Sequence, residues 1–209
     1  MPVSVTGVMA IYRQLATSAS IKPMRSVVLA VLILLFSGFA SAEKGIRQID
    51  FKNFSYPLSG STLGHDRLKW LDVSAARQIR LTNGKDNSRP PGFTLESVSF
   101  ADVAGQKQDD AIVVLHFNTG GTQQTDYVYI YTIAVGKPKL LAYFHAGDRA
   151  YSGLRRVYAE DGKLVVELFD PEKKSGDCCS SGIVRTRYKW QHGRFEAVGT
   201  SEHETLEEQ

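Results

Sequence analysis

The sequence predicts a mainly β protein, a single domain rich in antiparallel sheet. Short apolar or alternating runs follow one another from residue 46 to residue 198, and their many Val, Ile, Tyr, Phe and Thr residues suit a pleated sheet. Tight turns connect several of these runs, and strands joined so closely must be antiparallel. We expect a sandwich, a barrel-like sheet or a curved meander, with at most one short helix.

The predicted strands follow in chain order. They are 46–54, 93–100, 111–117, 126–135, 139–146, 155–159, 163–170, 183–190 and 194–198. Three connectors carry hairpin signals, namely Gly136-Lys137-Pro138, Asp161-Gly162 and His192-Gly193. The segment 64–80 is the one place where the pattern would also suit a short helix.

Side-chain alternation assigns faces to two of these strands. In 126–135, Tyr127, Tyr129 and Tyr131 share one side while the other side is also apolar, which indicates a central strand. We expect the tyrosine stripe to face the core, and a platform that binds carbohydrate or protein is the alternative. In 183–190 the basic residues share one face, which we expect to be solvated. They are Arg185, Arg187 and Lys189.

Residues 1–42 have the layout of a secretory signal peptide. Arg25 precedes the apolar run 27–36, and Ala40-Ser41-Ala42 forms a small-x-small cleavage site before Glu43. The run is too short to span a bilayer, so we expect no membrane span after signal removal, and a retained N-terminal anchor is the alternative. These features predict a periplasmic or secreted protein.

The predicted boundaries and the charge follow from this export segment. We expect 1–23 to be a leader from a mis-annotated start, 43–199 to be the β domain, and 200–209 to be a disordered acidic tail. Three of the 25 basic residues and none of the 22 acidic ones precede residue 43, so the rest of the chain carries 22 of each. This balance gives no electrostatic case for nucleic-acid binding.

Two loops are candidate sites. The loop 145–157 carries Asp148, Arg149 and Tyr151 among glycines, and we expect these three residues to contribute to binding, although an ion pair that merely pins the loop is equally reasonable. The loop 101–110 resembles the calcium-binding loops of secreted FG-GAP-like segments. Gln106 and Lys107 replace an acid and a glycine of that pattern, so we expect a plain turn and no metal site.

Other signals for chemistry are weak. The five histidines show no metal-ligand spacing, and no nucleophile or metalloprotease motif is present, so we expect no catalytic residue and no cofactor. Cys178 and Cys179 are the only cysteines, and export to an oxidising compartment gives them a structural role. A vicinal disulfide is favoured, and an intermolecular bridge or two buried thiols are the alternatives.

Several motifs in a consistent order resemble a family of small exported bacterial proteins of uncharacterised function. The motifs are FKNFSYP (51–57), FADVAG with DDAIVVL (100–115), TGGTQQTDYVYIYT (119–132), GDRAYSGLRRV (147–157) and GDCCSSGIVRTRYKW (176–190). The chain departs from the expected pattern at Gln106 and Lys107, at Ser152, where glycine would be usual, and at Ser180, where proline would be usual. The resemblance implies export and a β fold, and it supplies no activity.

Two functional hypotheses remain. The first is an exported, non-enzymatic β domain that binds a protein or an envelope polymer, with the partner and the oligomeric state undefined. The alternative is a small secreted hydrolase with its site on the loop 147–153 and Asp148 as acid or base, which would need a cleft that tunes the pKa of this carboxyl group.

Overall fold

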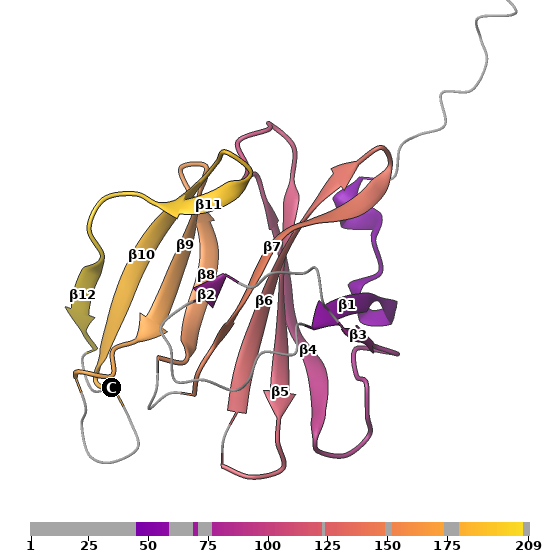
Figure 1. Ribbon diagram of the computed structural model, residues 1–209, viewed down its shortest axis with the longest axis horizontal. Coiled ribbons are helices and arrows are strands. Elements are labelled where there is room, and N and C mark those ends of the chain that lie inside the picture. Colours follow the sequence, from indigo (N-terminus) through magenta and orange to yellow (C-terminus); the bar gives the residue numbers. More distant parts are fainter. Residues whose placement is uncertain are drawn as a thin grey trace, which may run out of the picture. The chain divides into compact units, whose positions relative to one another are not determined.

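The fold is read from a computed structural model that describes residues 45–58, 69–70, 77–122, 124–148, 152–173 and 180–206. All of them belong to one compact unit, Glu43–Gln209. Its strands form two five-stranded sheets and one small two-stranded sheet, all with antiparallel pairing (Figure 1). The prediction of a mainly β, antiparallel protein is confirmed, and in the described residues the sheets do not close into a barrel.

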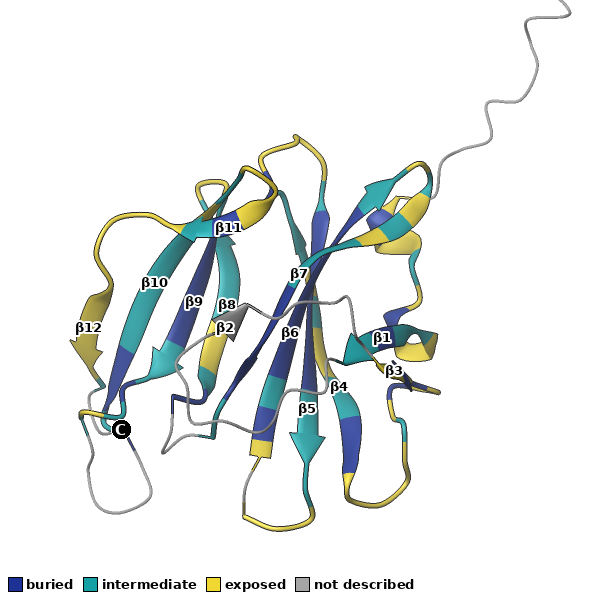
Figure 2. Cartoon of the chain, in the orientation of Figure 1, coloured by how far each residue is buried: buried dark blue, intermediate teal, exposed yellow. Residues whose placement is uncertain are grey.

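The central sheet has the strand order β2-β7-β6-β5-β4. Its strands are β2 (Lys69–Trp70), β4 (Gly92–Ala101), β5 (Asp110–Asn118), β6 (Gln124–Ala134) and β7 (Lys137–Ala146). The middle strands β5 and β6 are buried along most of their length, as the dark ribbon segments in Figure 2 show. The prediction that β6 is a central strand is therefore confirmed, and its apolar side chains serve two cores at once.

The second sheet has the order β11-β10-β9-β8, with β12 also paired to β10. Its strands are β8 (Leu154–Glu160), β9 (Lys163–Phe169), β10 (Gly182–Gln191), β11 (Arg194–Ala197) and β12 (Glu202–Thr205). This sheet and the central sheet share an apolar core, to which β5 and β6 contribute Ile112, Val114 and Ile130, and β9 contributes Leu164 and Val166. The two sheets thus pack against each other through one face of each.

The N-terminal segment covers the opposite face of the central sheet. It contains two 3-10 helices, η1 (Ile46–Gln48) and η2 (Phe51–Asn53), followed by β1 (Ser55–Leu58), which pairs with β3 (Arg77–Arg80). Phe51 and Tyr56 enter a core with the predicted tyrosine stripe of β6, whose members are at most 9% exposed. The stripe therefore faces the core, as predicted.

Three hairpins have tight turns, two of them at the predicted residues; the third lies at Val135-Gly136, one residue before the predicted Gly136-Lys137-Pro138, because Lys137 and Pro138 already belong to β7. Backbone φ is positive at both central residues of Val135-Gly136, Asp161-Gly162 and His192-Gly193, which is the type I′ conformation that matches the twist of two paired strands. Glycine takes the second position in each, because it adopts a positive φ without steric cost.

The structure corrects three sequence-based expectations. Residues 46–54 contain two 3-10 turns instead of a strand. The second turn is stabilised by the Asp50 carboxylate, which accepts hydrogen bonds from the Lys52 backbone N–H (3.0 Å) and the Asn53 side-chain amide (2.7 Å). The tail expected to be disordered forms strand β12 over Glu202–Thr205, through backbone pairing with β10. The segment 64–80 ends in strand β3, and most of its remainder lies outside the described residues.

A separate correction concerns the face of β10 that carries the basic residues. Only Lys189 is exposed; the side chains of Arg185 and Arg187 are 21% and 28% exposed and engaged in ion pairs.

No helix in the described part of the chain is long and apolar enough to cross a membrane.

Candidate functional site

The loop that sequence reasoning favoured is only partly described. Asp148 is half-buried just after β7, while Arg149 and Tyr151 lie outside the described residues. An isolated bridge joins Gly147 to Gly153 and closes the base of this loop. Binding by Asp148, Arg149 and Tyr151, and the hydrolase alternative built on Asp148, therefore stay predictions.

Cys178 and Cys179 also lie outside the described residues. We expect native protein to show no reactive thiol towards a colorimetric thiol reagent, and its mass to be lower than that of the reduced chain by two hydrogens, because a vicinal disulfide removes both thiols. Two reactive thiols in native protein would contradict the vicinal disulfide. A dimer that separates on reduction would assign the cysteines to an intermolecular bridge.

The acidic loop before β5 uses its carboxylates to hold its own backbone. Asp102 accepts hydrogen bonds from the backbone N–H groups of Gln106 (3.0 Å) and Lys107 (2.8 Å), and Asp110 accepts from Val103 (3.1 Å) and Ala104 (2.9 Å). Burial raises the pKa of Asp110 above its ordinary value, against the effect of these hydrogen bonds. Carboxylates engaged in this way define a rigid turn.

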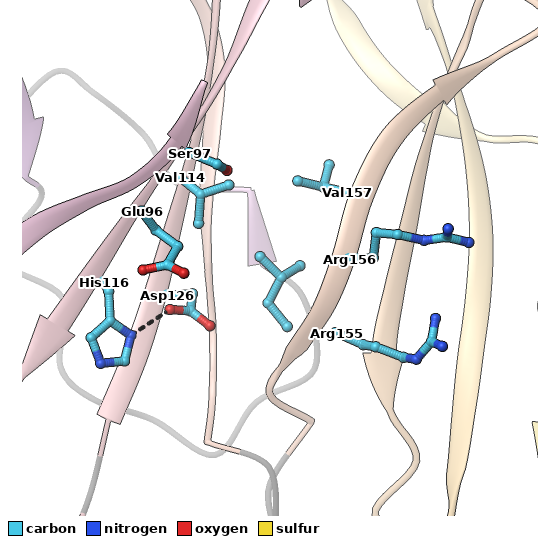
Figure 3. Close-up of a pocket in the computed structure, with 9 residues that line it drawn as sticks. Glu96, Ser97, Val114, His116, Asp126, Arg155, Arg156 and Val157 are labelled. Atoms are coloured by element: carbon cyan, nitrogen blue, oxygen red, sulfur yellow. Dashed lines mark hydrogen bonds and ion pairs between the residues drawn. The ribbon is translucent and has the colours of Figure 1, made fainter. Parts of the chain in front are cut away.

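A pocket of about 390 Å³ lies between the central sheet and β8. Its polar residues Glu96, Ser97, His116 and Asp126 come from β4, β5 and β6, as Figure 3 shows. The other lining residues are Val114, Leu154, Arg155, Arg156 and Val157. Sequence reasoning did not identify this pocket, because it assembles residues from four strands.

Two β-bulges shape the pocket. On β4 the pairing register shifts between Leu95 and Ser97, and on β8 it shifts between Leu154 and Arg156. A bulge places an extra residue on one strand and re-aims its neighbours. The sequence carries a signal for both, since Leu95-Glu96-Ser97-Val98 and Leu154-Arg155-Arg156-Val157 each separate two apolar residues by two polar ones.

The bulge on β4 and the bulge on β8 give the two walls of the pocket different side chains. On β4, Leu95 and Val98 pack into the core beneath the N-terminal segment, so that Glu96 lines the pocket. On β8, Leu154 and Val157 pack into the core between the sheets and give the pocket an apolar side. The result is a pocket with carboxylates on one wall and with apolar side chains and two arginines, Arg155 and Arg156, on the other.

The acidic wall contains a hydrogen-bonded pair. His116 and Asp126 are direct cross-strand partners, and the His116 Nδ1 and Asp126 Oδ1 atoms lie 2.8 Å apart. Burial raises the pKa of Asp126 above its ordinary value; the hydrogen bond from His116 opposes this effect, and the nearby Glu96 carboxylate adds to it. Asp126 is 22% exposed and so remains open to a ligand.

The two arginines on the opposite wall direct their charges elsewhere. Arg156 Nη2 lies 2.9 Å from Glu167 Oε1, and the Arg155 guanidinium contacts the same carboxylate. Figure 3 shows both guanidinium groups turned away from the carboxylates of Glu96 and Asp126. The pocket is therefore acidic in spite of the two arginines on its rim.

Glu167 is the centre of a charge row that crosses the second sheet. The register places Arg156 opposite Glu167, Glu167 opposite Arg185, and Arg185 opposite Glu202, so opposite charges alternate across β8, β9, β10 and β12. Arg185 Nε lies 2.8 Å from Glu167 Oε1, and the Tyr158 hydroxyl donates to the same oxygen over 3.2 Å. Burial alone would raise the pKa of Glu167, but the hydrogen bonds from three arginines outweigh it and lower this pKa to about 2.

The pocket holds a hydrogen-bonded His–Asp pair, which can serve as a general base when a side-chain nucleophile or a water molecule lies within hydrogen-bond reach. Figure 3 shows Ser97 and His116 apart from each other in the pocket. Among the described residues, no hydrogen bond joins Ser97 to His116. Within the same described residues, no group of three His, Cys, Asp or Glu side chains could hold a metal ion.

Compared with known proteins, the chain matches no family model, no curated protein and no solved structure. The resemblance described above thus depends on the short motifs alone.

Proposed function

We propose that the chain is an exported β domain, periplasmic or secreted, that binds a protein or an envelope polymer without catalysing a reaction. We assign the binding to the pocket of Glu96, His116 and Asp126, and its ligand group to a cation such as an amine or a guanidinium. The signal-peptide layout of residues 1–42 supports export.

One observation carries the assignment of a cationic ligand. Glu96 and Asp126 bring two carboxylates to one wall, while the arginines on the other wall direct their charges towards Glu167. Among the described residues Glu96 has no hydrogen-bond or ion-pair partner, so its carboxylate is available to a ligand. Val114, Leu154 and Val157 offer the apolar contact that the methylene stem of a lysine or a diamine would need.

The proposal predicts that the pocket prefers a cationic probe. In an NMR titration, Nα-acetyl-lysine methylamide should shift the amide signals of His116 and Asp126, whereas the norleucine analogue, which keeps the stem and lacks the charge, should not. In the double variant Glu96→Gln/Asp126→Asn we expect an affinity loss of about tenfold or more, because charge-assisted hydrogen bonds contribute about 1.5–3 kcal/mol each.

The matched control is Glu196→Gln, which removes an acid on β11 that pairs with Arg194, away from the residues that line the pocket. This variant should bind the probe like the wild type. Pull-downs from envelope extract with the wild type and the double variant would then identify the natural partner. Equal binding of the lysine and norleucine probes would contradict the proposal.

The affinity should also depend on pH. The pKa of Asp126 is raised, so this carboxylate takes up its proton at a higher pH than an ordinary aspartate and then no longer attracts a cation. We expect affinity to fall on acidification, beginning above the ordinary aspartate range. Asp126→Asn should remove this part of the pH dependence, and an unchanged profile in the variant would exclude Asp126 as its origin.

A further inference from the structure

Strand β12 differs from the other strands of the second sheet in how it is held. All four of its residues are exposed, and none belongs to either apolar core. It pairs through its backbone with the edge of β10 from Gly182 to Arg185, while β11 covers the stretch of the same edge from Tyr188 to Gln191. In Figure 1, β12 lies beside β10 at the outer margin of this sheet. Backbone pairing and charge, rather than apolar burial, therefore hold β12 in place.

The charges of β12 match those of the edge. Glu202 and Glu204 are two residues apart and so point to the same side of the strand. Arg185 Nη2 lies 3.0 Å from Glu204 Oε2, and Arg187 Nη1 lies 2.6 Å from Glu202 Oε1. A further hydrogen bond joins His203 Nδ1 and Asp170 Oδ2, which lie 2.8 Å apart. These contacts select an extended segment with acids at alternate positions.

If β12 left the β10 edge, this edge would still favour a segment with acidic side chains. The two acids of β12 would leave, while Glu167 would continue to hold Arg185 and Glu160 would continue to hold Arg187. The arginines on this side of the sheet would then outnumber the acids. The backbone groups of Gly182–Arg185 that now pair with β12 would be open to another strand, which is the arrangement that strand addition requires.

We propose that the β10 edge from Gly182 to Arg185 is a docking site for an extended acidic segment of a partner protein, and that β12 occupies this site within the chain. The partner segment carries acidic residues at alternate positions, as Glu202 and Glu204 do in β12. This site is separate from the pocket, since none of the pocket-lining residues belongs to β10 or β12. Failure of one proposal therefore leaves the other unaffected.

The test uses the full chain and a labelled peptide with the sequence of residues 200–209. In the variant Glu202→Lys/Glu204→Lys, the tethered strand is repelled by the arginines and frees the edge. We expect the peptide to bind this variant about tenfold or more tightly than the wild type. In the wild type the tethered β12 competes with the peptide for the edge, and its short tether gives it an effective concentration in the millimolar range. Fluorescence anisotropy measures both affinities.

Three controls define the chemistry. A peptide with lysines in place of Glu202 and Glu204 should bind neither protein. Adding Arg187→Gln to the variant should weaken peptide binding about threefold or more, because this arginine contacts Glu202 and Glu160 but not the buried Glu167. The single variant Glu204→Lys, which disturbs fewer contacts, should give an intermediate affinity and covers the case in which the double variant folds poorly.

Three outcomes would overturn the proposal. One is that the peptide binds neither protein, or both equally. Another is that the lysine peptide binds as well as the acidic one. The last is a concentration-dependent dimer of the wild-type chain, detected by light scattering, that the peptide does not dissociate, because the edge would then belong to a second copy.

Discussion

Replacing Glu167 with glutamine is expected to lower the free energy of unfolding by about 3–5 kcal/mol, the usual cost of breaking a buried ion pair from one side. The Glu167 side chain is fully buried, and guanidinium groups from Arg155, Arg156 and Arg185 converge on it. Glutamine keeps the shape but leaves these positive charges without their shared counter-ion. Urea denaturation at neutral pH measures the difference.

Glu202→Gln is the matched control. Glu202 is the β12 member of the same charge row, but its side chain is 51% exposed, and exposed pairs contribute about 1 kcal/mol or less. A loss of less than 1 kcal/mol in Glu167→Gln would show that the arginines find other partners, and would contradict the central role of this carboxylate.

The acid dependence of stability tests the same residue independently. The pKa of Glu167 falls from 4.5 to about 2 on folding, so its contribution is fully present above pH 4.5 and is lost as the pH falls towards 2. The wild type should lose about 3 kcal/mol over this interval through Glu167, at 1.36 kcal/mol per pKa unit. Glu167→Gln should lack this component of the acid slope, whereas Glu202→Gln should retain it.

Tyr129→Ala is expected to cost about 3–5 kcal/mol, as is usual when a large aromatic side chain is removed from a core. Tyr129 is fully buried, and its ring stacks on Tyr143 with a centroid distance of 5.3 Å and an interplanar angle of 5°. Its hydroxyl donates a hydrogen bond to the Pro57 carbonyl over 3.0 Å, which ties β1 to the central sheet. Alanine would remove both contacts and leave a cavity. Thermal and urea unfolding measure the loss.

Tyr129→Phe separates the two contributions. It keeps the stacked ring and removes only the hydroxyl, so we expect a loss of about 1 kcal/mol. If phenylalanine cost as much as alanine, the hydrogen bond to β1 would be the dominant contact and the packing argument would be wrong.

Much of the fold could be predicted because its strands follow local rules. Alternation identified β4–β11, and the residue pairs at 135–136, 161–162 and 192–193 have the turn geometry that joins their strands. The strand β12 was missed because it contains only charged and polar residues, and cross-strand ion pairs with β10 hold it in place. Such pairs depend on the register, which no local pattern reveals.

The pocket was missed for a related reason. Glu96, His116 and Asp126 have no informative spacing in the chain, and only the pairing of β4, β5 and β6 brings them together. The repeated pattern of two polar residues between two apolar ones could have indicated the bulges on β4 and β8. It would not have shown that the two bulges line one pocket.

Two positions where the resembled motifs would have glycine have a glycine-like backbone. Lys107 and Ser152 adopt φ values of 59° and 62°, in the left-handed region that glycine favours. Ser180, where the resembled motif would have proline, is buried, and its hydroxyl oxygen lies 2.5 Å from the Asp170 carbonyl oxygen and 2.8 Å from the Gly182 carbonyl oxygen. Its single proton can be donated to one of these carbonyls at a time.

The position of the N-terminal segment sets an order of assembly. Pro57 and the hydroxyl that binds its carbonyl are 72 residues apart in sequence, and Phe51 contacts Tyr131 at a ring distance of 5.8 Å. A chain made from its N-terminus therefore exposes Phe51 and Tyr56 until β6 and β7 have been synthesised, and these non-local contacts form late. The first residues of the domain to be made are among the last to be buried, so slow synthesis prolongs the exposure of their aromatic side chains.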